Sequence, residues 1–202
     1  GAVVSTDISE HMVDSIQTTA ATRGLSHITS RRAHAEERVF EAASFDAALC
    51  GLGLMYVPDP RAALTELRRV LKPGGRAVIA VWGSRAKCGW AEIFPIVDSR
   101  VQSEVCPMFF QLGSGESLRL LMESAGFTHT QSDRLSTILR YDSAEDALGA
   151  AFVGGPVAMA YAHFNEQTRE AAHAEYLESI ARFADGTGYA IPGEFVVARG
   201  VA

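Results

Sequence analysis

Two apolar runs flank an amphipathic pattern between residues 44 and 83. The first run, residues 45–54, and the second, residues 77–82, lack the polar alternation of a strand with one face in water. Such runs predict strands buried on both faces, as in a parallel sheet. Between them, Leu and Val recur at helical spacing from Asp59, a favourable N-cap, to Pro73, which stops the helix. The stretch therefore predicts a strand–helix–strand unit with a right-handed crossover.

The rest of the chain continues this alternation of strands and helices. Further strands are expected at residues 2–6, 25–29, 134–140 and 194–199, and helices at 9–24, 90–101, 114–125, 143–152 and 165–183. This order predicts one α/β domain over residues 1–202, with helices on both faces of its sheet. We expect the segments 84–113 and 143–185 to be insertions that lie as lids on the substrate side.

Net charge, the length of apolar runs and cysteine spacing argue against several functional classes. The 202 residues carry a net charge of −6, whereas a nucleic-acid-binding protein is expected to have a basic footprint. No apolar run approaches the roughly 18 residues that span a membrane. Cys50, Cys88 and Cys106 are irregularly spaced, which predicts neither a complete set of disulfides nor a metal site and favours the reducing cytoplasm.

Three motifs in the central stretch carry a family resemblance. They are SFD at 44–46, VPDP at 57–60 and RVLKPGG at 69–75. Their wording resembles the class I S-adenosylmethionine-dependent methyltransferases, in particular the type 11-like group related to the ubiquinone/menaquinone biosynthesis C-methyltransferases. The resemblance implies a Rossmann-like, doubly wound, mostly parallel sheet of seven strands with the last one antiparallel. It also implies S-adenosylmethionine as cofactor, S-adenosylhomocysteine as product, and methyl transfer to a small molecule by direct displacement at the sulfonium methyl.

The same resemblance bears on the start of the chain. Gly1 is followed at once by a strand pattern and there is no initiator Met. In the family, a strand at the centre of the sheet and a glycine-rich turn come before this point. We therefore expect that strand and turn to be missing from the 202 residues.

Asp7 is the first candidate for cofactor binding. A carboxylate at the end of a strand and before a helix can accept hydrogen bonds from both hydroxyls of a ribose. It can equally serve only to begin the helix at Ser9. The resemblance of VSTDISEHM, residues 4–12, favours the ribose role and implies that Ile8 and Met12 lie beside the adenine ring, although Met12 could instead be helix core.

A second group of candidates is His34, Ala35 and Glu36. The resemblance places His34 where the family has an Asp that binds the adenine amino group. A neutral His can still accept a hydrogen bond, but a weaker one than a carboxylate. The alternative is that His34 is an ordinary surface histidine.

The end of the central strand supplies the remaining candidates. Ligands bind at the carboxyl ends of strands in open α/β sheets, so Cys50, Gly51 and Leu52 are expected to line the methionine end of the cofactor. Met55, Tyr56 and Trp90 are expected on the substrate side. Trp90 belongs to an aromatic group that could be either a lid or the core of its own insertion; the other members are Phe94, Phe109 and Phe110.

The sequence identifies no catalytic residue. Methyl transfer relies on the cofactor for its difficult chemistry, so a base is needed only if the acceptor must lose a proton. His11, Tyr56 and His163 qualify by residue type alone. One alternative function is a catalytically inactive methyltransferase-like binding or regulatory protein, and a weaker one is a nicotinamide-dependent oxidoreductase. Pairing into a homodimer stays open.

Overall fold

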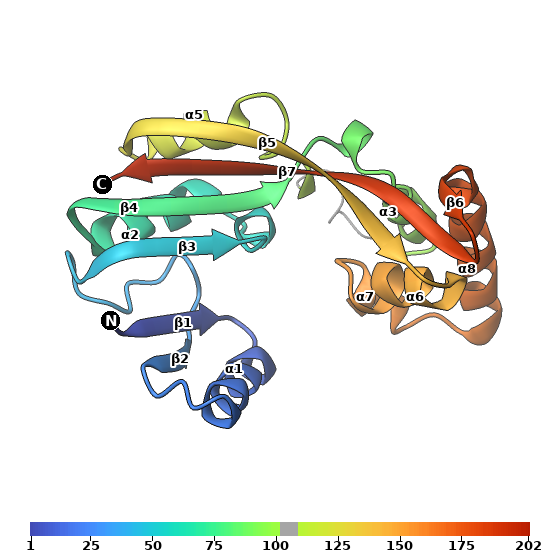
Figure 1. Cartoon of the computed structure of the whole chain (residues 1–202), viewed down its shortest axis with the longest axis horizontal. Coiled ribbons are helices and arrows are strands. Elements are labelled where there is room, and N and C mark those ends of the chain that lie inside the picture. The colour runs from blue at the N-terminus through green and yellow to red at the C-terminus, as the bar shows by residue number, and fades with distance from the viewer. Residues whose placement is uncertain (102–108) are drawn as a thin grey trace.

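The computed structural model describes residues 1–101 and 109–202. Cys106 and the neighbouring part of the expected 84–113 insertion lie outside the described residues. Figure 1 shows the arrangement of the chain, and the labels below are those of the figure.

The N-terminal unit is strand β1 (Val3–Asp7), helix α1 (Glu10–Thr22) and strand β2 (Ile28–Arg32). The strands pair in parallel. The predicted first strand and helix are confirmed, and Ser9 caps the helix by accepting a hydrogen bond from Met12 N. The second strand begins three residues later than predicted, because Leu25 N still bonds to Ala20 O in the turn that ends α1.

The predicted strand–helix–strand unit is present. It comprises β3 (Phe45–Gly51), the 3₁₀ turn η1 (Leu54–Tyr56), α2 (Pro60–Val70) and β4 (Leu71–Trp82). Asp59 caps α2, with its Oδ1 accepting from Ala62 N at 2.9 Å. β4 starts six residues earlier than predicted because Leu71 already pairs with Phe45, ahead of a register shift that leaves extra residues in β4 before Arg76 pairs with Ala47.

Two long antiparallel strands complete the main sheet. Helix α5 (Ser117–Ser124) precedes β5 (Thr128–Tyr141), and the chain ends with the short β6 (Ala184–Asp185) and with β7 (Gly188–Val201). The strand order is β3-β4-β7-β5, with β6 beside β7 and β7 antiparallel to both long neighbours. The expected antiparallel last strand is thus confirmed.

β7 is longer than the sequence predicts, and Pro192 lies inside it. Before Phe195, in the part of β7 that contains Pro192, the strand pairs with β5 but not with β4. Proline lacks the N–H that a central strand would need, so it is tolerated where a strand has a neighbour on one side only.

The far ends of β5 and β7 lead into a helical lobe (Figure 1). Its elements are the 3₁₀ turn η2 (Arg85–Lys87), α3 (Ile93–Asp98), α6 (Ala144–Leu148), the π-helical η3 (Gly149–Val153), α7 (Ala158–Tyr161), α8 (Glu166–Ile180) and the 3₁₀ turn η4 (Ala181–Phe183). The helix predicted at 165–183 is confirmed as α8 with η4. The helix predicted at 90–101 is shorter, and α7 was not predicted.

The prediction that the central strand is buried on both faces is wrong for β3. Leu49 is 80% exposed, because no described segment covers its side of the strand. β4 is better buried, since Ala77, Ile79 and Val81 are fully enclosed.

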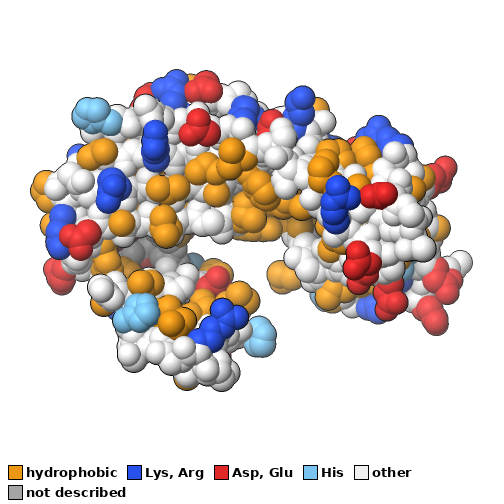
Figure 2. Space-filling model, in the orientation of Figure 1, with side chains coloured by type: hydrophobic (Ala, Val, Ile, Leu, Met, Phe, Trp, Pro, Cys, Tyr) orange, Lys and Arg blue, Asp and Glu red, His pale blue; other side chains and the backbone are white. Residues whose placement is uncertain are grey.

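The strands form two sheets among the described residues. β1 pairs with β2 and β3 pairs with β4, but β1 and β3 do not pair with each other. Figure 1 shows β1 and β3 next to each other with the same direction. The main sheet bridges the α1 unit and the helical lobe, and Figure 2 shows an open hollow between these two parts, with hydrophobic side chains on the sheet above it.

Candidate functional site

The carboxyl ends of the parallel strands lie at one edge of the structure. β1 ends at Asp7, β3 at Gly51 and β4 at Trp82, and Figure 1 shows all three strands pointing toward the hollow. This edge is where open α/β sheets bind ligands. The strands thus bring most of the residues predicted for the cofactor and substrate to one side of the molecule.

Asp7 has the structural role considered for it at the start of α1, and its role toward a ribose stays a prediction. Its Oδ1 accepts a hydrogen bond from Ser9 N at 2.8 Å, which shapes the turn into α1. Among residues 1–101 and 109–202, no hydrogen bond or ion pair engages its Oδ2. The half-buried carboxylate therefore has one oxygen fixed by the backbone and one oxygen available to a ligand.

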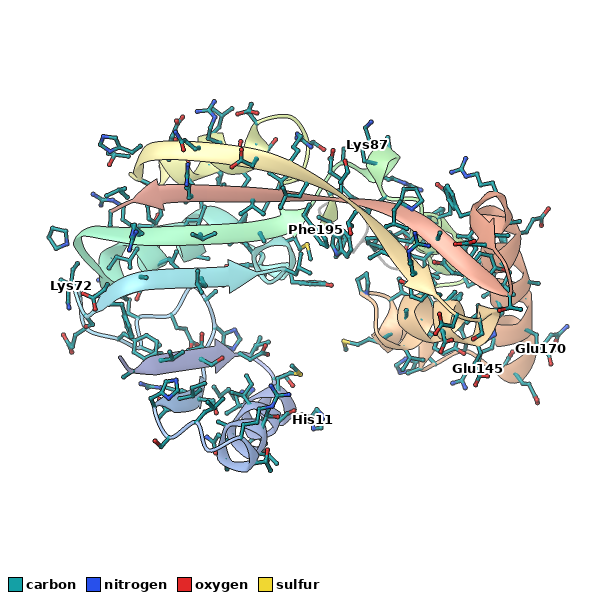
Figure 3. All side chains as sticks on the ribbon, in the orientation of Figure 1. His11, Lys72, Lys87, Glu145, Glu170 and Phe195 are labelled. Atoms are coloured by element: carbon teal, nitrogen blue, oxygen red, sulfur yellow. The ribbon has the colours of Figure 1, made fainter. Side chains whose placement is uncertain are left out.

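Ile8 and Met12 form an apolar surface beside this carboxylate. Ile8 is 55% exposed and Met12 is 46% exposed, so Met12 is not a core residue of the helix. Figure 3 places His11 at the same end of α1, on the side of the hollow. A flat, weakly polar ring could cover the two apolar side chains.

The loop after β2 holds His34, Ala35 and Glu36. His34 is exposed, and within the described chain its ring makes no hydrogen bond. Glu36 has a structural partner instead, because its Oε1 accepts from Asp59 N at 2.8 Å. This bond links the loop to the start of α2, and the role of the loop toward adenine stays a prediction.

The end of β3 is strained at Leu52. Leu52 has φ 58, a left-handed conformation that costs a residue with a side chain about 1–3 kcal/mol. Its N–H donates to Ala80 O at 2.8 Å, which holds the turn against β4. The sequence carries no signal for this strain, since a Gly stands on either side of Leu52 but not at it.

Cys50 is half-buried at this turn. Burial raises the pKa of its thiol, although backbone hydrogen bonds at Gly53 and Leu54 oppose the rise. A thiol with a raised pKa is protonated at neutral pH and is a poor nucleophile. Cys50 is accordingly a packing residue next to the site rather than a reactive group.

The three residues predicted on the substrate side differ in exposure. Met55 and Trp90 are 6% and 8% exposed, whereas Tyr56 is 53% exposed. Tyr56 packs edge-on against Phe109, with ring centroids 5.4 Å apart. Burial raises the pKa of Tyr56, so its phenol is neutral at physiological pH and does not act as a ready base.

Behind Tyr56 stands an aromatic wall, by which we mean Trp90, Phe94, Phe109 and Phe110. All four are buried and in mutual ring contact. Trp82 at the end of β4 contacts Trp90 and stacks on Phe195, which Figure 3 labels on the sheet above the hollow. Their burial therefore indicates that these rings form the core of their insertion rather than a lid. Tyr56 is the exposed residue beside this core.

Two polar pairs in the structure are not predicted by the sequence. In the helical lobe, Tyr161 Oη lies 2.9 Å from His173 Nε2. Burial, together with the nearby Arg169, lowers the pKa of His173. Between β5 and β7, Arg134 pairs with Glu194 at 2.7 Å. Both pairs join residues far apart or on different elements, where local patterns give no signal.

Other features lie away from this edge. A cavity of about 440 Å³ lies between α1 and β2 and includes none of the predicted site residues. His163 is exposed in the helical lobe, with Nδ1 2.9 Å from Met159 O. In the part of the chain that the structure describes, no three metal-ligating side chains cluster, and no helix has the length and apolarity to cross a membrane.

Comparison with known families and curated proteins gives consistent matches. Residues 1–79 match a family described as "Methyltransferase domain". The uncharacterized protein YafE of Escherichia coli is 40% identical over 39% of this chain and 38% of its own length. The uncharacterized protein Rv1405c of Mycobacterium tuberculosis is 31% identical over 81% of this chain and 60% of its own length. A demethylmenaquinone methyltransferase of Staphylococcus carnosus is 29% identical over 83% of this chain and 68% of its own length.

Solved structures share the fold. The YcgJ protein of Bacillus subtilis superposes with a TM-score of 0.67 at 18% identity, covering 99% of this chain and 82% of YcgJ. A phosphoethanolamine N-methyltransferase of Haemonchus contortus, solved with S-adenosylhomocysteine, gives a TM-score of 0.59 at 16% identity, covering 98% of this chain and 43% of that one. The chain thus spans well under two thirds of several proteins that it matches. In its motifs, its matched residues 1–79 and its sheet, the chain is similar to the class I S-adenosylmethionine-dependent methyltransferases, in particular to the group related to the ubiquinone and menaquinone C-methyltransferases.

Proposed function

We propose that the protein containing these residues transfers a methyl group from S-adenosylmethionine to a small-molecule acceptor, by direct displacement at the sulfonium methyl. The observation that carries this proposal is the edge where Asp7, with an unengaged carboxylate oxygen, lies on the same side as the end of β3. The methyltransferase names of several relatives support it, and none of the proteins described above favours the non-catalytic alternative.

The residues present fit this cofactor. Asp7 Oδ2 would accept hydrogen bonds from the ribose hydroxyls, and the exposed side chains of Ile8 and Met12 would cover the adenine. The backbone at Cys50, Gly51 and Leu52 would line the methionine end. When bound, the sulfonium supplies an already electrophilic methyl group. The protein's own task is then to orient the acceptor and exclude water.

The acceptor side is assigned to Tyr56 and to the segments 84–113 and 143–185. Tyr56 is the exposed ring next to the strand ends, and α7 carries Met159, which is 83% exposed. Figure 1 shows α7 on the side of the helical lobe that faces the hollow. Because relatives are named as demethylmenaquinone methyltransferases, a demethylated quinol is the first acceptor to test.

β1 and β3 lie next to each other but are not paired. Each of these parallel strands has a neighbour on its outer side, and among the described residues neither has one on the facing side. Val3 and Val4 on β1 are 48% and 37% exposed, which is unusual for valines in a strand of a central sheet. We infer that a strand from outside these 202 residues lies between them and joins the two sheets into one.

The activity is tested by transfer of an isotopically labelled methyl group from S-adenosylmethionine in the whole protein. Candidate acceptors, beginning with a short-chain demethylmenaquinol, are screened for label. Enzyme-dependent labelling of one acceptor is expected. Binding of S-adenosylhomocysteine without labelling of any acceptor would favour a non-catalytic role.

A further inference from the structure

An ion pair between a buried carboxylate and a partly exposed guanidinium lies where segment 84–113 joins the sheet. Glu194 on β7 is 7% exposed and is the buried charged side chain among the described residues. Its Oε2 accepts from Arg134 Nη1 on β5 at 2.7 Å. A buried carboxylate is costly unless it is paired and hydrogen-bonded, so this placement calls for an explanation.

The pair holds both ends of the segment. At the start, the Glu194 carboxylate accepts from Ser84 N at 3.3 Å, next to the backbone bond from Gly83 N to Glu194 O at 2.6 Å. At the end, Arg134 Nη2 donates to Gly113 O at 3.1 Å and also to Gly115 O. The planar guanidinium can make these contacts together because its donors are fixed in a fork.

Glycines let the two ends approach this closely. A Cβ on Gly113 would lie 1.9 Å from Trp82 O, and a Cβ on Gly83 would lie 2.3 Å from Glu194 Oε2. No side chain fits at either position. The segment therefore leaves and rejoins the sheet at one point, and the Arg134–Glu194 pair lies at that point.

The aromatic wall is carried between these ends. Within the wall, Phe109 contacts Tyr56, the exposed residue of the proposed acceptor side, and Trp90 contacts Trp82. One further anchor is the bond from Gly89 N to Pro192 O at 2.8 Å. Ring packing resists separation of the rings but lets them slide, whereas directional hydrogen bonds at both ends fix one placement.

We propose that Arg134 and Glu194 are positioning residues that set the placement of the aromatic wall against Tyr56. This inference rests on the proposed function only for the use of Tyr56, which packs on the wall, as an acceptor contact. Replacing a buried ion pair by apolar residues of similar size is often neutral or stabilising, and in this pair the buried partner is Glu194, whereas the Arg134 side chain is 37% exposed. The apolar double variant therefore separates a role of the pair in positioning the segment from a role in stabilising the fold.

The test uses the whole protein with Arg134→Met/Glu194→Leu as the main variant. Hydrogen exchange followed by mass spectrometry compares the amides of residues 83–88 and 109–116 with those of α2 and α8. We expect exchange at the two segment ends to be about tenfold faster or more, with no change in α2 and α8, because the loss is a local opening. Acrylamide quenching of tryptophan fluorescence should increase as well, since Trp82 and Trp90 are the two tryptophans of the 202 residues.

Two further variants keep the result decisive. Arg134→Lys retains the charge opposite Glu194 but lacks the fork, so we expect fast exchange at 109–116 with protection retained at 83–88. Arg140→Met is the matched control, because Arg140 lies on the same strand and pairs with Asp185 in an exposed bridge at 3.0 Å. Parent-like exchange at both segment ends in the double variant would overturn the proposal. Because exchange needs no cofactor, this result is independent of whether S-adenosylhomocysteine binds.

Discussion

Asp7 holds the turn before α1 and is the residue that we propose for the ribose of the cofactor. Its Oδ1 is held by Ser9 N, which fixes the direction of the carboxylate before any ligand arrives. A group fixed in advance loses less conformational freedom on binding. The role at the helix start is therefore compatible with the proposed ribose role.

The two roles can be separated by substitution. Asp7→Asn keeps an acceptor for Ser9 N but removes the charge, whereas Asp7→Ala removes both. Charge-assisted hydrogen bonds contribute roughly 1.5–3 kcal/mol each, so Asp7→Asn should weaken S-adenosylhomocysteine binding at least about tenfold. Its thermal unfolding should stay near that of the parent, while Asp7→Ala should lose stability as well.

The control for this prediction is Ser9→Ala. It removes the cap that accepts from Met12 N and leaves Asp7 unchanged. We expect a stability loss of about 1 kcal/mol, typical of a lost N-cap, with unchanged ligand affinity. Equal affinity of Asp7→Asn and the parent, measured by calorimetry on the whole protein, would refute the ribose assignment.

Cys50 gives a second prediction at this scale. Because burial raises its pKa, the thiol is protonated at pH 7.5 and should react with iodoacetamide more slowly than the same cysteine in the denatured chain. Cys50→Ala should retain methyl transfer. Rapid alkylation of Cys50 in the native protein, located by peptide mapping, would contradict the assignment as a packing residue.

At the scale of elements, capping residues and glycines in the sequence are sufficient to predict where several helices begin and end. Ser9 and Asp59 cap their helices as predicted, and the glycine after α5, Gly126, has φ 92. The start of β4 was missed because it depends on pairing with Phe45, a contact made across the intervening helix. The extent of β7 was missed for the same reason, since strand pairing decides where it begins.

The site was predictable in part. The strand ends could be placed at one edge because parallel strands share a direction. Exposure of Tyr56 and burial of Met55 could not be predicted, as neighbouring residues of one 3₁₀ turn face opposite ways. The Arg134–Glu194 pair joins residues 60 positions apart and needs the sheet register to be known.

The contact between α7 and α8 gives a pH-dependent prediction. Burial and Arg169 lower the pKa of His173 from its ordinary 6.5, so the folded state favours the neutral ring. The unfolded chain then binds more protons as the pH falls through 6.5 toward the lowered pKa, and the free energy of unfolding decreases over that window. Above 6.5 this contribution is fully present.

The prediction is checked by urea unfolding between pH 5 and pH 8. His173→Gln keeps a partner for Tyr161 Oη but does not titrate, so its loss of stability on acidification should be smaller than that of the parent. His163→Gln removes an exposed histidine and should follow the parent curve. Identical pH profiles of His173→Gln and the parent would contradict the assignment.

For the whole molecule, the central feature is that β1 and β3 lie next to each other but do not pair. In the proposed site, β1 carries the ribose side and β3 carries the methionine side. If a further strand joins the two sheets in the whole protein, the backbone amides on the facing edges of β1 and β3 become hydrogen-bonded. Hydrogen exchange at residues 3–7 and 45–51 should then be much slower in the whole protein than in the 202-residue chain. Equal exchange in both would contradict the inserted strand.

The proposed cofactor site is tested most directly by calorimetric titration of the whole protein with S-adenosylhomocysteine. We expect saturable binding at one site per chain, weakened at least about tenfold by Asp7→Asn. The absence of any binding heat at millimolar ligand, together with no displacement of labelled S-adenosylmethionine, would contradict it.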